Sequence, residues 1–178
     1  MNYPEVTRIL VNEEEVRRTV ARLAGEINAS YRDLQAELLV VGLLRGSFIF
    51  MADLVRQIEL PLVVDFMTVS SYGDGTVSSG DVKVVMDLDS SIEGRDVLLV
   101  EDIVDTGRTF SKVIRMLANR NPRSLKVCTL LSKPSARVVM VPIDFCGQEI
   151  ANEFAVGYGL DYQQRYRNLP YVGVLEPG

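Results

Sequence analysis

Two carboxylates followed by a short polar loop form the stretch of this sequence with the most distinctive chemistry. Residues 97–109 read VLLVEDIVDTGRT. The four apolar residues at its start suit a strand that is covered on both faces of a parallel sheet, so Glu101 and Asp102 would stand where that strand ends. Asp105, Thr106, Gly107, Arg108 and Thr109 then lead into the amphipathic segment FSKVIRMLA. Unpaired N–H groups at a helix start form an anion site, and a neighbouring acidic pair suits ribose hydroxyls or a magnesium ion. The plainer interpretation is an ordinary strand–loop–helix turn with an acidic rim.

The composition narrows the chemistry further. The chain has no histidine, which excludes a Ser-His-Asp triad, an HExxH zinc helix and a histidine general base. Its two cysteines, Cys128 and Cys146, sit among apolar neighbours and are expected to be buried free thiols, so structural zinc is excluded too. Any metal should therefore be held by oxygen, which favours Mg²⁺. Acid–base catalysis must come from Asp, Glu, Lys or Tyr.

Charge and hydropathy exclude several kinds of partner. The net charge is −5 and the pI is about 4.9, which argues against general nucleic-acid binding, although a local cluster of N–H groups and basic side chains could still hold a small anion. The N-terminus lacks the pattern of a secretory signal. The apolar stretch 38–55 is interrupted by Arg45, Gly46 and Asp53, which argues against a membrane span. We expect a cytoplasmic protein with no nucleic-acid and no membrane partner.

The elements that would position these residues alternate along the chain. A length of 178 residues favours one domain, 1–178. Asn12 and Glu15 predict the capping box of a first helix. Strands are predicted at 38–43, 62–69, 82–86, 97–100 and 124–131, helices around 48–55 and 110–118, and short strands and turns over 138–174. Strands alternating with helices predict an α/β fold with a mostly parallel central sheet flanked by helices, and with ligands beyond the carboxyl ends of its strands.

Residues 70–80, SSYGDGTVSSG, have the composition of a loop. They contain three glycines and four serines. The segment is either a surface hairpin or an active-site lid, and composition alone leaves these two interpretations even.

Four segments together resemble one known family. They are LLRGSF, SSYG, VEDIVDTGRT and the pair LLSKPSAR and EFAVGYGLDYQQRYR. Over essentially its full length the chain resembles the bacterial hypoxanthine phosphoribosyltransferases of the type I phosphoribosyltransferase family. This resemblance implies the family's α/β fold, with a small base-binding hood at about 138–178 and a flexible lid at about 70–80. It also implies purine salvage: transfer of the 5-phosphoribosyl group of phosphoribosyl diphosphate (PRPP) to N9 of hypoxanthine and guanine, giving IMP and GMP. Mg²⁺ would be the cofactor, PRPP and a 6-oxopurine the substrates, and a dimer or tetramer the assembly.

The resemblance also assigns roles to individual residues. Asp105 takes the place of the carboxylate that accepts a proton at N7 of the purine. PRPP would be bound by Glu101, Asp102, Thr106, Gly107, Arg108 and Thr109, its pyrophosphate by Arg45, Gly46 and Arg167, and metal by Glu101, Asp102 and Asp161. The family's loop implies a cis peptide bond between Leu44 and Arg45. Ser71 and Tyr72 match the lid.

The base site is implied by four positions. Lys133 would donate to the 6-oxo group, Phe154 would stack on the purine, and Ile103 and the carbonyl of Ala155 would contact the base. Taken singly these residues have plainer interpretations: Lys133 is a solvated strand end and Phe154 a core aromatic. Arg137 is expected to be a structural or interface charge.

The sequence departs from the family pattern in two places. Arg45 stands where lysine is common, and Gln148 and Asn152 replace a more usual pattern before Phe154, which could alter the base pocket or a subunit contact. These departures bear on the preference for hypoxanthine over guanine and not on the reaction class. The alternative among enzymes is a xanthine- or guanine-preferring relative. Two alternatives of another class are an RNA-binding regulator on the same fold, against which the net acidity argues, and an inactive nucleotide-binding module, against which the filled catalytic positions argue.

Overall fold

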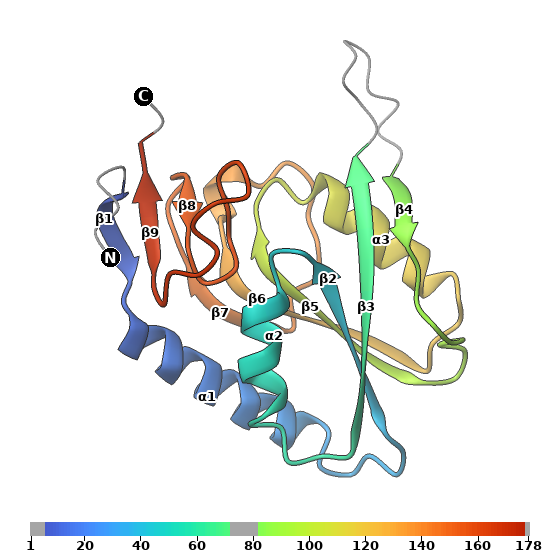
Figure 1. Ribbon diagram of the computed structural model, residues 1–178. Coiled ribbons are helices and arrows are strands. Elements are labelled where there is room, and N and C mark those ends of the chain that lie inside the picture. The colour runs from blue at the N-terminus through green and yellow to red at the C-terminus, as the bar shows by residue number, and fades with distance from the viewer. Residues whose placement is uncertain (1–5, 72–81, 177–178) are drawn as a thin grey trace.

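A six-stranded sheet forms the centre of the molecule. The computed structural model describes residues 6–71 and 82–176 (Figure 1). The strands are β2 (Leu38–Leu44), β3 (Leu62–Ser71), β4 (Val82–Met86), β5 (Asp96–Val104), β6 (Ser124–Ser132) and β7 (Phe145–Glu149), in the order β4-β3-β2-β5-β6-β7. β4 runs antiparallel to β3, and all the other neighbours are parallel. The predicted α/β fold with a mostly parallel sheet is confirmed.

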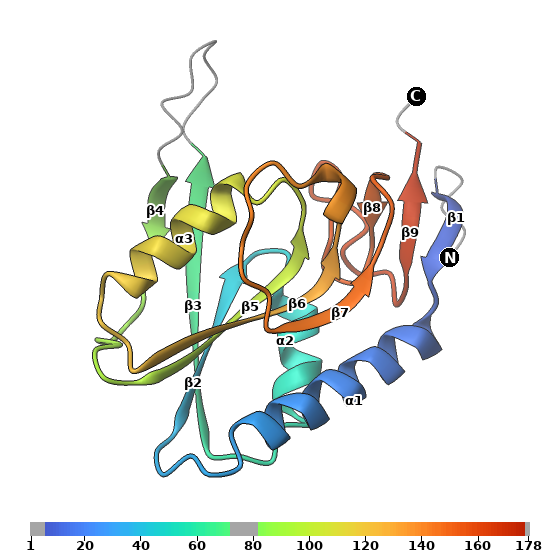
Figure 2. The same ribbon diagram turned by 180° about the vertical axis from the view of Figure 1, so that it is seen from behind.

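A second, antiparallel sheet stands beside the β6–β7 side of the first (Figures 1 and 2). It consists of β1 (Val6–Val11), β9 (Val172–Leu175) and β8 (Ala155–Val156), in the order β1-β9-β8. Within the range expected for the hood, about 138–178, β7 pairs with β6 in the large sheet, and β8 and β9 form the small sheet together with β1. β1 was not expected from the sequence. Its pairing partner lies at the other end of the chain, and its sequence, VTRILV, does not alternate between apolar and polar residues.

Helices cover both faces of the large sheet. α1 (Glu13–Ser30) and α2 (Phe48–Val55) lie on one face, and α3 (Arg108–Ala118) lies on the other, as the two opposite views show. The side chains of β5 alternate between the two cores: Leu98 and Val100 pack in the cluster of α1 and α2, and Val97 and Leu99 in the cluster of α3. All four are fully buried. Because β5 is buried on both faces, its position in the sheet is fixed, and so is the position of the residues at its carboxyl end.

The first helix begins as its sequence predicts. The side chain of Asn12 accepts from the N–H of Glu15 at 2.9 Å, and the Glu15 carboxylate accepts from the N–H of Asn12 at 2.8 Å. Such a capping box satisfies two donors that the helix itself leaves unpaired. No helix within residues 6–71 and 82–176 combines the length and the apolar composition that crossing a bilayer requires.

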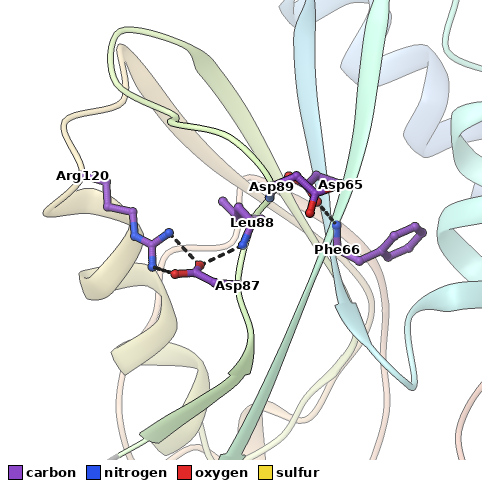
Figure 3. A network of polar contacts seen from close by, with 6 residues as sticks. All are labelled: Asp65, Phe66, Asp87, Leu88, Asp89 and Arg120. Atoms are coloured by element: carbon purple, nitrogen blue, oxygen red, sulfur yellow. Dashed lines mark hydrogen bonds and ion pairs between the residues drawn. The ribbon is translucent and has the colours of Figure 1, made fainter.

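A polar network ties β3, the segment after β4 and the end of α3 together (Figure 3). Asp87 accepts from both terminal nitrogens of Arg120, at 2.8 and 3.0 Å. Asp65 accepts from the N–H of Asp89 at 3.0 Å. The turn that follows α3 is thus joined to the segment after β4, and that segment is itself bound to β3.

Candidate active site

The predicted site residues meet in one cavity of about 500 Å³. It lies where β2 pairs with β3 on one side and β5 on the other, so that the loops after β2 and β5 diverge. Such a switch point is the usual ligand site of an open α/β sheet. The cavity is lined by Arg45, Gly46, Glu101, Asp102, Ile103, Asp105, Thr106, Gly107, Thr109, Lys133, Phe154, Ala155, Asp161 and Arg167, together with apolar residues of the surrounding strands.

Among the predicted site residues whose side chains the structure describes, Arg108 is the one that does not line this cavity. Arg108 is exposed at the first position of α3, and its N–H donates to the hydroxyl of Thr106 at 3.4 Å. Ser71 ends β3, and Tyr72 with the rest of the expected lid lies outside the described residues.

The loop between β5 and α3 has the form of an anion site. Gly107 adopts φ = 78°, and a Cβ there would lie 2.2 Å from the carbonyl oxygen of Val139. Only glycine fits this position, because both its backbone conformation and its space exclude a side chain. α3 follows immediately and buries Phe110, Val113 and Leu117. The amides of its first turn have no partner within the helix, and Thr109 and Phe110 of that turn line the cavity.

The acidic pair lies behind this loop in a buried position. Burial raises the pKa of Glu101 well above its usual range, and the neighbouring Asp102 raises it further. Burial also raises the pKa of Asp102, while the N–H of Ile103, donating at 2.8 Å, opposes that rise. Atom Oε2 of Glu101 is buried and has no hydrogen-bond partner among the described residues.

The loop after β2 packs directly against Asp102. The Leu44–Arg45 peptide bond is cis, as the resemblance implied. A Cβ on Gly46 would lie 1.6 Å from Oδ2 of Asp102, so the backbone of this loop touches the carboxylate. Gly159, at φ = 103°, closes the other side, because a Cβ there would lie 2.1 Å from the carbonyl oxygen of Gly46. The loop is held between β5 and the turn at Gly159.

Two arginines converge on one glutamine beside this loop. Arg45 donates to Oε1 of Gln164 at 3.3 Å, and Arg167 donates to the same atom at 3.0 Å. Arg167 also binds the carbonyl of Gly159 at 2.7 Å and pairs with Asp161 at 2.7 Å. Gln164 was not singled out from the sequence, and no local pattern marks it, since its role depends on two arginines that lie far apart in the chain.

The opposite end of the cavity combines a buried cation with an exposed ring. Lys133, only 6% exposed, places Nζ 3.5 Å from Oδ2 of Asp105. Phe154 is 43% exposed and meets Tyr162 edge-on, with ring centroids 5.6 Å apart. The interpretation of Phe154 as a core aromatic is therefore wrong, and so is that of Lys133 as a solvated strand end. An open aromatic face next to a buried ammonium suits a flat ring that carries a carbonyl group.

Gln148 does not reach this pocket. Its amide donates to the hydroxyl of Thr19 on α1 at 3.0 Å, and it is absent from the cavity lining, whereas Asn152 is exposed. Gln148 therefore contributes to the contact between β7 and α1.

The acidic residues do not form a closed metal cage. Within residues 6–71 and 82–176, no three or more acidic, histidine or cysteine side chains converge on one point. The carboxylate of Asp161 is already bound by Arg167 and by the N–H of Gln164. The unpartnered, buried oxygen of Glu101 and its neighbour Asp102 are nevertheless of the oxygen type that Mg²⁺ prefers, and a metal that also binds phosphate oxygens needs few protein ligands.

Comparison with known proteins agrees with this geometry. Residues 7–163 match the phosphoribosyl transferase domain family. The hypoxanthine phosphoribosyltransferase of Salmonella typhimurium is 54% identical over 165 residues, covering 93% of each chain, and the hypoxanthine-guanine phosphoribosyltransferase of Bacillus subtilis is 49% identical over 173 residues, covering 97% of this chain and 95% of its own. The crystal structure of a hypoxanthine phosphoribosyltransferase from Staphylococcus aureus superposes with a TM-score of 0.91 at 43% identity, over 97% of this chain and 93% of that one. The chain belongs to the phosphoribosyltransferase family of enzymes, in the group that contains the hypoxanthine phosphoribosyltransferases.

Proposed function

We propose that this enzyme transfers the 5-phosphoribosyl group of PRPP to N9 of hypoxanthine and guanine, releasing pyrophosphate. The observation that carries the proposal is the joining of two half-sites in one cavity: a phosphate loop with an acidic pair at one end, and a buried lysine with an open aromatic ring at the other. The similarity to hypoxanthine phosphoribosyltransferases supports the same substrates.

The PRPP half-site uses the loops after β5 and β2. The backbone of Thr106 to Thr109 binds the 5′-phosphate at the start of α3. Glu101 and Asp102 accept the ribose hydroxyls at the end of β5. Arg45 and Arg167, already side by side on Gln164, bind the pyrophosphate, for which their planar guanidinium groups are well suited.

The base half-site places the purine between β8 and the loop after β6. Phe154 stacks on the ring, while Ile103 and the carbonyl of Ala155 contact it. Lys133 donates to the 6-oxo group, and because an ammonium only donates, it leaves an exocyclic amine such as that of adenine without a partner. Asp105, 3.5 Å from Lys133, takes the proton at N7.

Catalysis then depends on charge control and positioning. Bond breaking at the anomeric carbon places positive charge on the ribose, and no protein nucleophile is needed. Mg²⁺, held by Glu101, Asp102 and Asp161 together with the substrate's own oxygens, would neutralise charge on the pyrophosphate. The lid expected around Ser71 and Tyr72 would keep water from the ribosyl cation.

The assembly and location are part of the same proposal. We expect a dimer or tetramer in the cytoplasm, which sedimentation at several protein concentrations and cell fractionation would test.

A parallel activity screen tests the function. Purified enzyme is given PRPP and Mg²⁺ with hypoxanthine, guanine, xanthine or adenine, and nucleotide formation is followed. We expect transfer to hypoxanthine and guanine, and almost none to adenine. Faster transfer to xanthine than to hypoxanthine would replace the proposed specificity, and no transfer to any base would contradict the proposal. Repeating the assay with EDTA should abolish transfer if Mg²⁺ is the cofactor.

A further inference from the structure

The segment that follows β6 binds the carbonyl groups at the end of β5 and at the start of the phosphate loop. The carbonyl of Val104 accepts from the N–H of Lys133 at 3.0 Å. The carbonyl of Thr106 accepts from the N–H groups of Val138 and Val139, at 2.9 and 3.0 Å. The carbonyls of Val104 and Thr106 are thereby turned toward the segment 133–139.

Arg137 supplies the remaining bonds of this arrangement. Its Nε donates to the carbonyl of Asp105 at 2.9 Å, and its Nη2 donates to the carbonyl of Val104 and the hydroxyl of Ser132, both at 2.9 Å. Its Cδ would lie 3.0 Å from a Cβ at Gly107, so the side chain packs against the loop as well as bonding to it. One guanidinium thus joins the two strand ends and the loop between β5 and α3.

This geometry bears directly on anion binding. A loop that binds a phosphate through N–H groups must keep its carbonyl oxygens away from the anion, because those oxygens carry partial negative charge. Three donors in a rigid plane can hold two successive carbonyls and a hydroxyl at once. A lysine ammonium on a flexible chain does not reproduce that arrangement.

We propose that Arg137 is a positioning residue for the 5′-phosphate site. It holds the carbonyls of Val104 and Asp105 away from the cavity, so that the amides of Thr106 to Thr109 are left for the phosphate of PRPP or of the nucleotide product. Arg137 does not line the cavity and touches no substrate itself. The inference rests on the proposed function, which places the 5′-phosphate at this loop.

Substitution of Arg137 should weaken the binding of ligands that carry the 5′-phosphate and leave the binding of the free base unchanged. The variants are Arg137→Lys, which keeps the charge, and Arg137→Met, which keeps the length. Arg115→Met, on the exposed side of α3, is the matched control. We expect the KM for PRPP and the Kd for IMP to rise by about 10–100-fold in both Arg137 variants, as for the loss of charge-assisted hydrogen bonds. The KM for hypoxanthine should stay within about two-fold.

A rescue experiment separates positioning from general stability. In Arg137→Ala, added ethylguanidinium should restore part of the lost affinity for PRPP, and ethylammonium at the same concentration should not. Melting temperatures of all variants show whether they are folded. An unchanged KM for PRPP together with an unchanged Kd for IMP would overturn the proposal. An equal rise in the KM values for PRPP and hypoxanthine, without rescue by ethylguanidinium, would overturn it as well. A wild-type enzyme that neither uses PRPP nor binds IMP would contradict the proposed function and this inference together, whereas an active wild type with unaffected variants contradicts the role of Arg137 alone.

Discussion

Asp105 and Lys133 form the point at which the two halves of the candidate site meet. Asp105 is the first residue after β5 and Lys133 is the first residue after β6, so these adjacent parallel strands bring the two side chains within 3.5 Å. The carboxylate is about half exposed toward the cavity, while the ammonium is buried. A proton acceptor and a donor-only group side by side match the N7 and 6-oxo edge of an oxopurine.

Replacing Asp105 should remove the proton acceptor and leave binding largely intact. Asp105→Asn keeps the shape of the side chain and its contact with Lys133, but not its basicity. We expect kcat to fall by about 10²-fold or more, with the KM for PRPP nearly unchanged. Steady-state kinetics with hypoxanthine measure both constants. Near-normal turnover would take Asp105 out of the mechanism.

Replacing Lys133 should affect the base and not PRPP. Lys133→Met removes the buried donor while retaining the aliphatic part of the side chain. We expect the KM for hypoxanthine to rise by about 10–150-fold, which corresponds to the loss of a charged hydrogen bond worth about 1.5–3 kcal/mol. Lys126→Met, near the amino end of β6, is the control and should leave both KM values unchanged. An unaltered KM for hypoxanthine in Lys133→Met would contradict the assigned contact.

At the level of elements, the sequence predicts those helices and strands whose burial leaves a pattern among residues that are close in the chain. The apolar run before Glu101 and the amphipathic residues after Gly107 place β5 and α3 correctly to within a few residues, because burial on two faces or on one leaves a local pattern. β1 and Gln164 could not be found this way. The partner of β1 is β9 at the far end of the chain, and Gln164 acquires its role only when Arg45 and Arg167 meet on it.

The contact between the loop after β2 and the end of β5 makes a specific prediction for Gly46. A methyl group there would overlap the carboxylate of Asp102, so Gly46→Ala should displace either the loop or the acid. Displacements of about 1 Å in an active site can lower the rate by about 10²-fold, and we expect a loss of that order in kcat/KM for PRPP.

Gly25→Ala provides the matched control for that substitution. Gly25 lies in the interior of α1, and a Cβ there would meet nothing within 4 Å. Alanine should stabilise this helix by about 0.5–1 kcal/mol and leave activity unchanged. Thermal unfolding and kinetics of the two variants test the pair. Full activity in Gly46→Ala would show that the loop can move away from Asp102 without consequence.

At the level of the whole molecule, the candidate site and the Asp96 ion pair lie at opposite ends of the large sheet. The carboxyl ends of β2, β5 and β6 carry the candidate site. At the amino ends of β5 and β6, Asp96 pairs with Arg123 and accepts from the hydroxyl of Ser124 at 2.6 Å. These contacts tie the starts of two adjacent central strands together, far from the residues that line the cavity, so stability and activity can be altered separately.

The Asp96 pair should make stability depend on pH in a predictable direction. The hydrogen bond from Arg123 holds the pKa of Asp96 below its usual value, so its contribution is fully present above the unfolded pKa of about 3.9 and is lost as the pH falls through the lower, folded pKa. Asp96→Asn should therefore lower the melting temperature by several degrees at pH 7. The difference from wild type should shrink as the pH falls below about 4, while kcat at 25 °C stays unchanged. Asp87→Asn is the control, because the side chain of Asp87 is 51% exposed against 8% for that of Asp96, and its ion pair should contribute less. A difference between Asp96→Asn and wild type that is equally large at pH 3 and pH 7 would show that the ion pair is not its source.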